Sequence, residues 1–135
     1  MIEDYKQSES WKRQGNNFLI EVKHYIQNTI SCWEEEHRWN VYAYIYPKHP
    51  HFAKFDGTEK MWQDAACALP LHAGPSFCRI HVDHKTGAYC SYQVGSDYSH
   101  LHDDHFSHYA TPNEAYEVFE DADHLFDWLS VQGAG

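Results

Sequence analysis

The sequence predicts an α+β fold: a mainly antiparallel sheet of about four strands, with a C-terminal amphipathic helix and a short middle helix packed on it. Three observations support this class. Two segments alternate apolar and polar residues with the period of two that is typical of strands. Two further segments flank a turn sequence, which predicts a hairpin. Residues 111–133 carry apolar side chains at the three- to four-residue spacing of an amphipathic helix.

The two clearest strand signals lie at 18–27 and 39–46. In the first, large apolar residues and His24 alternate with polar residues and one tyrosine. In the second, one face is aliphatic and aromatic and the other carries Tyr42, Tyr44 and Tyr46. Such a pattern is typical of a central strand with two different faces. Pro47 is expected to end this strand, because proline has no N–H to donate to a ladder.

Other local signals place the remaining elements. Residues 76–83 and 88–95 flank Lys85-Thr86-Gly87 and are predicted to form the hairpin. Residues 58–69 are predicted to be a short helix with Thr58 as its N-cap and Pro70 after its end. Thr111-Pro112-Asn113-Glu114 resembles a capping box at the start of the last helix, and Gly133 is placed to end it. For the polar residues 1–16 we expect a loose arm or a short helix.

Length and composition predict one domain over residues 1–135. The chain is 42% apolar and 16% aromatic and has no repeat or Gly/Ser-rich linker. It has no run of about 18 apolar residues, as a membrane span needs, and no apolar region near Met1, so we expect a cytoplasmic protein without a signal peptide. The four cysteines form no C-x-x-C pair, which favours reduced thiols over a zinc knuckle.

The charge is unevenly distributed. The net charge is −10, and all ten Lys and Arg residues lie between Lys6 and Lys85. Residues 1–85 hold ten basic and eleven acidic side chains, whereas residues 86–135 hold nine acidic and no basic ones. Such a field disfavours direct binding of nucleic acid and favours cations or a basic protein surface as partners.

The segment 95–108 has the composition of a candidate active site. It holds four histidines and three aspartates, and Asp97, His100 and Asp103 are spaced as D-x-x-H-x-x-D. With His72 they form a predicted metal site, because imidazole combined with carboxylates suits Zn²⁺, Mn²⁺ or Fe²⁺. Asp97, His100 and Asp103 are also the predicted catalytic residues. The alternative is a polar loop whose shape is fixed by an Asp–His pair without metal.

A second candidate is the segment Leu71-His72-Ala73-Gly74-Pro75-Ser76. Gly74 would allow the backbone to come close to a ligand or to the other loop. The alternative is a tight turn with a surface histidine. His81 could reach the same pocket, although a hydrogen-bonded sheet histidine is the simpler interpretation. A Cys–His nucleophilic pair of Cys78 or Cys90 with His72 is disfavoured, because no third orienting group is evident.

Three of these motifs resemble those of a family of small phage- and prophage-encoded proteins of uncharacterised function. Pro47-Lys48-His49-Pro50-His51-Phe52 is similar to the family's G-H-P-x-[YF], and residues 72–76 are similar to H-G-G-x-[ST]. Residues 95–103 are similar to G-F-D-x-x-H-x-G-D. The chain departs from these patterns with Ala73, Ser96 and His102. The resemblance implies a joint site of His72, Asp97, His100 and Asp103 with His49 near it, and a bacterial host cytoplasm.

Two functional hypotheses follow. In the first, the protein is a metal-dependent hydrolase of a nucleotide or other phosphoester, and the metal supplies hydroxide near neutral pH. Tyr42, Tyr44 and Tyr46 would then stack on a base or sugar, and Arg79 would help to neutralise a phosphate. In the second, the protein is a non-catalytic acidic inhibitor of a host defence or nucleic-acid-handling protein, and evades host defence by charge mimicry. The oligomeric state is open.

Overall fold

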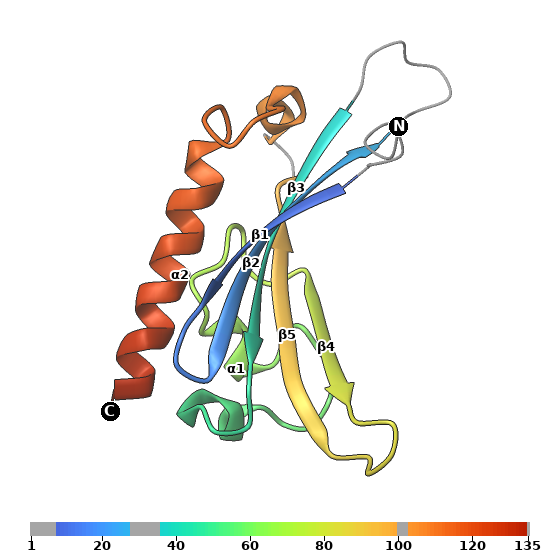
Figure 1. Ribbon diagram of the computed structural model, residues 1–135, viewed down its shortest axis with the longest axis vertical. Coiled ribbons are helices and arrows are strands. Elements are labelled where there is room, and N and C mark those ends of the chain that lie inside the picture. Colours follow the sequence, from blue (N-terminus) through green and yellow to red (C-terminus); the bar gives the residue numbers. More distant parts are fainter. Residues whose placement is uncertain (1–7, 28–35, 100–102, 135) are drawn as a thin grey trace.

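A five-stranded antiparallel sheet carries one long helix on one face. The computed structural model describes residues 8–27, 36–99 and 103–134 (Figure 1). The strand order is β1-β2-β3-β5-β4. The strands are β1 (Ser8–Gln14), β2 (Phe18–Gln27), β3 (Glu36–Ile45), β4 (Phe77–Val82) and β5 (Tyr89–Asp97). The helices are α1 (Asp64–Cys67), α2 (Tyr116–Ala134) and the 3-10 helices η2 (Pro50–Lys54) and η3 (Asp104–His108). The predicted α+β class is confirmed.

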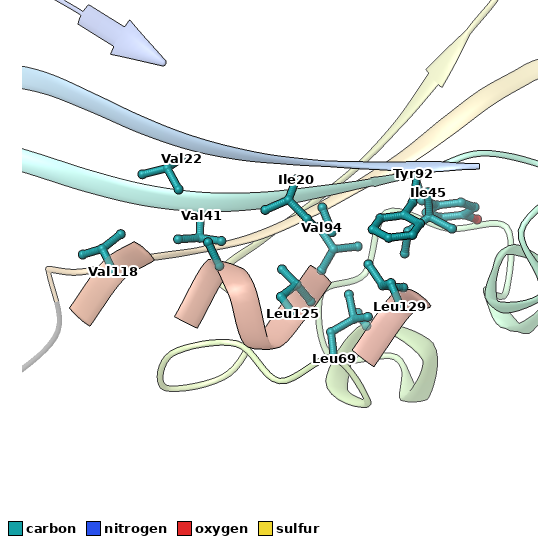
Figure 2. Packing of buried hydrophobic residues seen from close by; sticks show 14 of the residues in the cluster. Ile20, Val22, Val41, Ile45, Leu69, Tyr92, Val94, Val118, Leu125 and Leu129 are labelled. Atoms are coloured by element: carbon teal, nitrogen blue, oxygen red, sulfur yellow. The ribbon is translucent and has the colours of Figure 1, made fainter. Parts of the chain in front are cut away.

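The core lies between the sheet and α2. Residues of β3 alternate between buried and half-buried, so Val41 and Ile45 face the helix. Along α2, Val118, Leu125 and Leu129 recur on one face and are fully buried. Figure 2 shows these three side chains directed from the helix towards the sheet. Burying each such side chain contributes about 1.5–3 kcal/mol, so the predicted apolar stripe is what holds α2 on the sheet.

The structure corrects the expected loose arm or short helix at residues 1–16 where it describes them, whereas residues 1–7 lie outside the described ranges. Ser8–Gln14 forms the edge strand β1, which pairs antiparallel with β2 from Ser8↔Tyr25 to Gln14↔Leu19. Trp11 is its only large apolar residue, and it packs against Trp39 and Phe119. An edge strand needs little apolar surface, because its outer edge faces solvent. This strand therefore has a polar sequence and raises the strand number from about four to five.

The middle helix is much shorter than predicted. Only Asp64–Cys67 is α-helical, and Thr58 is not the N-cap. The Asp56 carboxylate accepts hydrogen bonds from the backbone N–H and the hydroxyl of Thr58, and Gly57 between them has φ +82°. The Gln63 side chain donates to the carbonyls of Thr58 and Lys60 and accepts from the N–H of Asp56. These side-chain hydrogen bonds replace the first turns of the expected helix.

The hairpin and the long helix agree with the prediction in their main parts. Asp83 accepts hydrogen bonds from the N–H groups of Lys85 and Thr86 in the β4–β5 turn. Thr111 and Glu114 contact each other as in a capping box, one turn before α2 begins. Gly133 does not end the helix, which continues to Ala134. None of the described helices is long and apolar enough to cross a membrane.

The sheet face opposite α2 carries the second set of alternating side chains. No described helix packs on this face, and we call it the open face. The strand pairing places Lys23, Asn40 and Asp97 in one row across β2, β3 and β5. The next row along the strands holds Glu21, Tyr42, Gly95 and Phe77. This face therefore combines tyrosines with both basic and acidic groups.

Candidate functional site

His72 and Asp103, two of the four residues of the predicted metal site, form a close pair. His72 Nε2 lies 2.8 Å from Asp103 Oδ2, so the imidazole donates to the carboxylate. The Asp103 side chain is 8% exposed and that of His72 is 27% exposed. The pair joins the loop before β4 to the start of η3. A buried carboxylate that holds an imidazole in one orientation is an arrangement used both in general-base sites and in purely structural ones.

Tyr98 connects this pair to α2. Its ring stacks on the His72 imidazole with 4.3 Å between the ring centroids. Its hydroxyl donates to Asp121 on α2. Burial and the hydrogen bond to Asp121 both raise the pKa of Tyr98, so the phenol stays protonated. The contacts of Tyr98 with His72 and with Asp121 therefore connect the loop to the helix and fix the loop in place.

The predicted four-residue metal site is only partly assembled in the described residues. Asp97 is the last residue of β5 and points to the open face, where it lines a hollow with Asn40 and Tyr42. Tyr98, the next residue, points to the other face and to His72, because side chains alternate along a strand. His100 lies outside the described residues. Within the described ranges, no group of three His, Cys, Asp or Glu side chains could hold a metal ion.

His49 has a structural position under α2. It is 1% exposed, and its Nε2 lies 2.9 Å from the carbonyl oxygen of Leu129 in α2. Its Nδ1 accepts a hydrogen bond from the N–H of His51. His49 thus joins η2 to the last turns of α2, and these contacts do not bring it to the His72–Asp103 pair.

Of the other predicted ligand-binding residues, Gly74 lies in the turn before β4, whereas Tyr44 and Arg79 flank Gln93 in one row of the open face. Gly74 has φ +83° in the turn that precedes β4, so the turn itself requires glycine. Tyr44 donates from its hydroxyl to Glu21 at 2.9 Å on the open face. Arg79 is exposed on β4. His81 is hydrogen-bonded to Gln93 Oε1 at 2.7 Å, which agrees with its interpretation as a sheet histidine.

The environment of Cys78 makes this thiol a poor nucleophile. Cys67, Cys78 and Cys90 are free thiols, in agreement with the prediction, and Cys32 lies outside the described residues. Burial raises the pKa of Cys78 to about 11. A thiol with such a pKa is almost fully protonated at neutral pH and is a poor nucleophile.

Two adjoining hollows lie on the open face. One of about 490 Å³ is lined by Ser8, Lys23, Tyr25, Ile26, Asn40 and Tyr42. The other, of about 140 Å³, shares Tyr25, Asn40 and Tyr42 and extends to Phe77 and Asp97. The ring of Tyr42 packs edge-on against Phe77, with 5.5 Å between the ring centroids. Together the hollows have the size of a small-molecule site.

The polar groups between the two tyrosines are incompletely satisfied. The Asn40 side chain donates to the Tyr42 hydroxyl at 3.1 Å, but its buried Oδ1 has no hydrogen-bond partner in the described part of the chain. A buried carbonyl oxygen without a donor costs about 1–3 kcal/mol. Lys23, its register partner on β2, is exposed and makes no ion pair with any residue of the described ranges. An anionic group of a ligand in the hollow would therefore pair with Lys23, whereas Asn40 Oδ1 is buried and is not reached from the hollow.

The sequence reasoning missed a second histidine cluster on the helix-covered face. His24 Nδ1 lies 3.2 Å from Glu9 Oε1, and His24 Nε2 lies 2.8 Å from His37 Nδ1. Burial is the main cause that lowers the pKa of His24. A neutral His24 donates to Glu9 and accepts from His37, which fixes both tautomers. The alternation of 18–27 placed His24 on the buried face, but only the strand register brings His37 to it.

Comparisons of the chain with protein-family models, with curated proteins and with solved structures give no significant match. The phage-family resemblance and the host-cytoplasm setting therefore stay predictions. The same holds for metal binding, hydrolysis and the acidic-inhibitor role.

Proposed function

We propose that the protein binds a mononucleotide on the open face of its sheet. The observation that carries this proposal is the hollow of about 490 Å³ that Tyr25, Asn40 and Tyr42 line together, with Lys23 beside them. Tyrosine rings offer flat surfaces on which a nucleobase stacks, at about 1–3 kcal/mol per base. Asn40, whose side-chain amide donates to the Tyr42 hydroxyl, is a polar residue of the same lining. The proposal keeps the nucleotide of the hydrolase hypothesis and does not depend on a metal.

The charged residues in the same row as Asn40 favour a nucleotide over an uncharged aromatic ligand. Lys23 and Asp97 flank Asn40 on neighbouring strands. Two strand spacings separate them by about 10 Å, which is similar to the distance from a base to its 5′-phosphate. A base amine would face the Asp97 carboxylate, and the phosphate would face the ammonium group of Lys23. Although the chain is acidic overall, this row provides an exposed cation.

The test is a titration of ¹⁵N-labelled protein with AMP, CMP, GMP and UMP, each to about 5 mM, which reaches weak affinities near a millimolar Kd. We expect at least one of them to shift the amide signals of Lys23, Asn40 and Tyr42. Tyr42→Ala should abolish these shifts. Tyr116→Ala should not, because Tyr116 is an exposed tyrosine on α2, outside the hollow. If all four nucleotides leave the three amides unchanged, the proposal is wrong.

The contribution of the phosphate is measured separately. We expect the nucleotide that binds best to bind more tightly than its own nucleoside, and Lys23→Gln to remove this difference. A Lys23→Gln variant that keeps the full difference would place the phosphate elsewhere. Phosphorus NMR spectra of the same samples, with and without Zn²⁺ or Mn²⁺, test the hydrolase hypothesis, because only hydrolysis releases inorganic phosphate from the nucleotide.

A further inference from the structure

The two edges of the sheet differ in how far they are protected against pairing with a further strand. At the β4 edge, the Glu59 carboxylate accepts a hydrogen bond from the N–H of Ile80 at 2.9 Å, and the ladder is irregular at His81 and Val82. Blocking groups and irregularities of this kind prevent edge-to-edge pairing. At the outer edge of β1, no residue within the described ranges makes a backbone hydrogen bond. β1 is therefore the edge at which another strand can add.

The hydrogen-bond pattern of the β1–β2 hairpin determines which groups of β1 point outwards. The N–H of Gly15 donates to the carbonyl of Phe18 at 2.8 Å, so this is a hydrogen-bonded pair. Such pairs alternate along an antiparallel ladder, which directs the backbone groups of Arg13, Trp11 and Glu9 towards β2. The N–H and C=O groups of the residues between them therefore point away from the sheet. These residues are Ser8, Ser10, Lys12 and Gln14.

We propose that β1 pairs antiparallel with β1 of a second copy of this chain, around a two-fold axis at Trp11. This register pairs all seven residues of the strand and places its outward-pointing groups opposite each other. Ser8 then faces Gln14 of the second copy and Ser10 faces Lys12, which gives about eight new hydrogen bonds. The result is a continuous ten-stranded sheet in which both copies of α2 lie on the same face.

The side chains of β1 are complementary to themselves in this register. Glu9 lies directly opposite Arg13 of the second copy, and the two-fold axis makes this pair occur twice. Glu9 already contacts His24 through Oε1 at 3.2 Å, and a carboxylate has enough lone pairs to accept from a guanidinium as well. Opposite charges in directly opposed positions of a ladder are stabilising, whereas like charges are destabilising. Arg13 already contacts Asp123 at 3.2 Å, and its guanidinium has enough donors to bind a second carboxylate. A shift by two residues would instead place Lys12 against Lys12 or Ser10 against Ser10.

An apolar hollow beside β1 adds to this surface. It has a volume of about 170 Å³ and is lined by Trp11, Val22, Phe119 and Ala122, among others. In the proposed register Trp11 faces Trp11 of the second copy on this side of the sheet. Cross-strand aromatic pairs contribute up to about 1 kcal/mol. The second copy therefore covers apolar surface in addition to pairing backbone groups.

The first test changes only the outward N–H group. Ser10→Pro removes an N–H that β2 does not use, and proline is tolerated at such edge positions. Ser10→Ala keeps this N–H and is the matched control. In sedimentation equilibrium up to about 0.1 mM chain, which saturates a micromolar Kd, we expect the wild type and Ser10→Ala to have twice the chain mass of 15.9 kDa, and Ser10→Pro to have the chain mass.

The second test uses charge exchange and does not depend on the proline variant. Glu9→Arg and Arg13→Glu should each be monomeric, because like charges oppose each other twice in either homodimer. An equimolar mixture should form a heterodimer, since both pairs are then complementary, and native mass spectrometry identifies it. Circular dichroism verifies that each variant is folded. A monomeric wild type, a dimer that persists in folded Ser10→Pro, or a mixture of folded variants that stays monomeric would each overturn the proposal.

Discussion

The ring of Tyr42 lies directly over Gly95, its partner on the neighbouring strand. A Cβ atom at residue 95 would come within 2.3 Å of Tyr42 Cδ1 and 2.7 Å of the Val41 carbonyl oxygen. No side chain fits there, so glycine is what allows the tyrosine to lie flat across β5. The position of this ring defines the wall that both hollows of the open face share.

We therefore predict that Gly95→Ala has two effects: it destabilises the protein and it weakens nucleotide binding. Overpacking of this kind costs about 1–3 kcal/mol in the free energy of unfolding, which urea denaturation measures. Adding Tyr42→Ala removes one of the two clashes. The double variant should thus lose less stability than the sum of the single losses. Strict additivity would mean that the Tyr42 ring is not the obstacle.

Because Asp103 is paired with His72, two adjacent aspartates should contribute differently to the free energy of unfolding. Asp103 is buried and accepts from His72, whereas Asp104 is exposed. Asp103→Ala should lower the free energy of unfolding by about 1–3 kcal/mol, because it leaves a half-buried imidazole without its acceptor. Asp104→Ala should change it by less than about 0.5 kcal/mol. Equal effects at both positions would show that the pair does not fix the loop.

Most elements could be predicted because one of their faces is buried. The alternation in β2 and β3 and the stripe of α2 record directly which side chains meet in the core. β1 could not be found in this way, since an edge strand with one apolar residue, Trp11, has no such pattern. The helix expected at 58–69 failed for a different reason. The side chains of Asp56 and Gln63 compete for backbone groups, and helix propensity does not account for this competition.

The candidate site was predictable in part. The motifs correctly associated His72 with Asp103, which are 31 residues apart. The sequence pattern predicts that the strand ends at Gly95, so that Asp97 lies in the segment after the strand and belongs to one site with His72. In fact β5 continues to Asp97, and this extension turns the carboxylate to the open face. Tyr25 was not foreseen as a partner of Tyr42, because the register between strands cannot be read from the pattern of either strand.

The burial of His51 predicts that the protein loses stability as the pH falls. It is 1% exposed, its Nε2–H donates to the Ala65 carbonyl, and its Nδ1 has no partner among the described residues. Burial lowers its pKa below the ordinary value of 6.5. The unfolded chain therefore takes up a proton first as the pH falls. Stability contributed by the neutral ring is complete above 6.5 and decreases as the pH falls through 6.5 towards the lowered pKa.

Urea unfolding at about pH 8 and about pH 5.5 measures this dependence. In His51→Gln the decrease between the two values should be smaller than in the wild type. His24, whose pKa is lowered mainly by burial, accounts for part of the decrease that remains. His84→Gln is the matched control at an exposed position in the β4–β5 turn and should keep the wild-type decrease. An unchanged decrease in His51→Gln would contradict the burial argument.

The hydrogen bond between Tyr98 and Asp121 joins the sheet to α2 and predicts that the two residues are energetically coupled. The Tyr98 ring is 2% exposed, and its hydroxyl donates to the Asp121 carboxylate on the helix. Tyr98→Phe should lower the free energy of unfolding by about 1.5–3 kcal/mol, because hydrogen bonds to charged groups are the stronger ones. Asp121→Asn should lower the free energy of unfolding by less, since the amide oxygen still accepts from the phenol.

The double variant tests whether the two residues act through this hydrogen bond. In the Tyr98→Phe background, Asp121→Asn should lower the free energy of unfolding by almost nothing further, because the carboxylate has already lost its donor. A double variant whose loss equals the sum of both single losses would mean that the two residues act independently and that the packing of the ring alone holds α2 at this point.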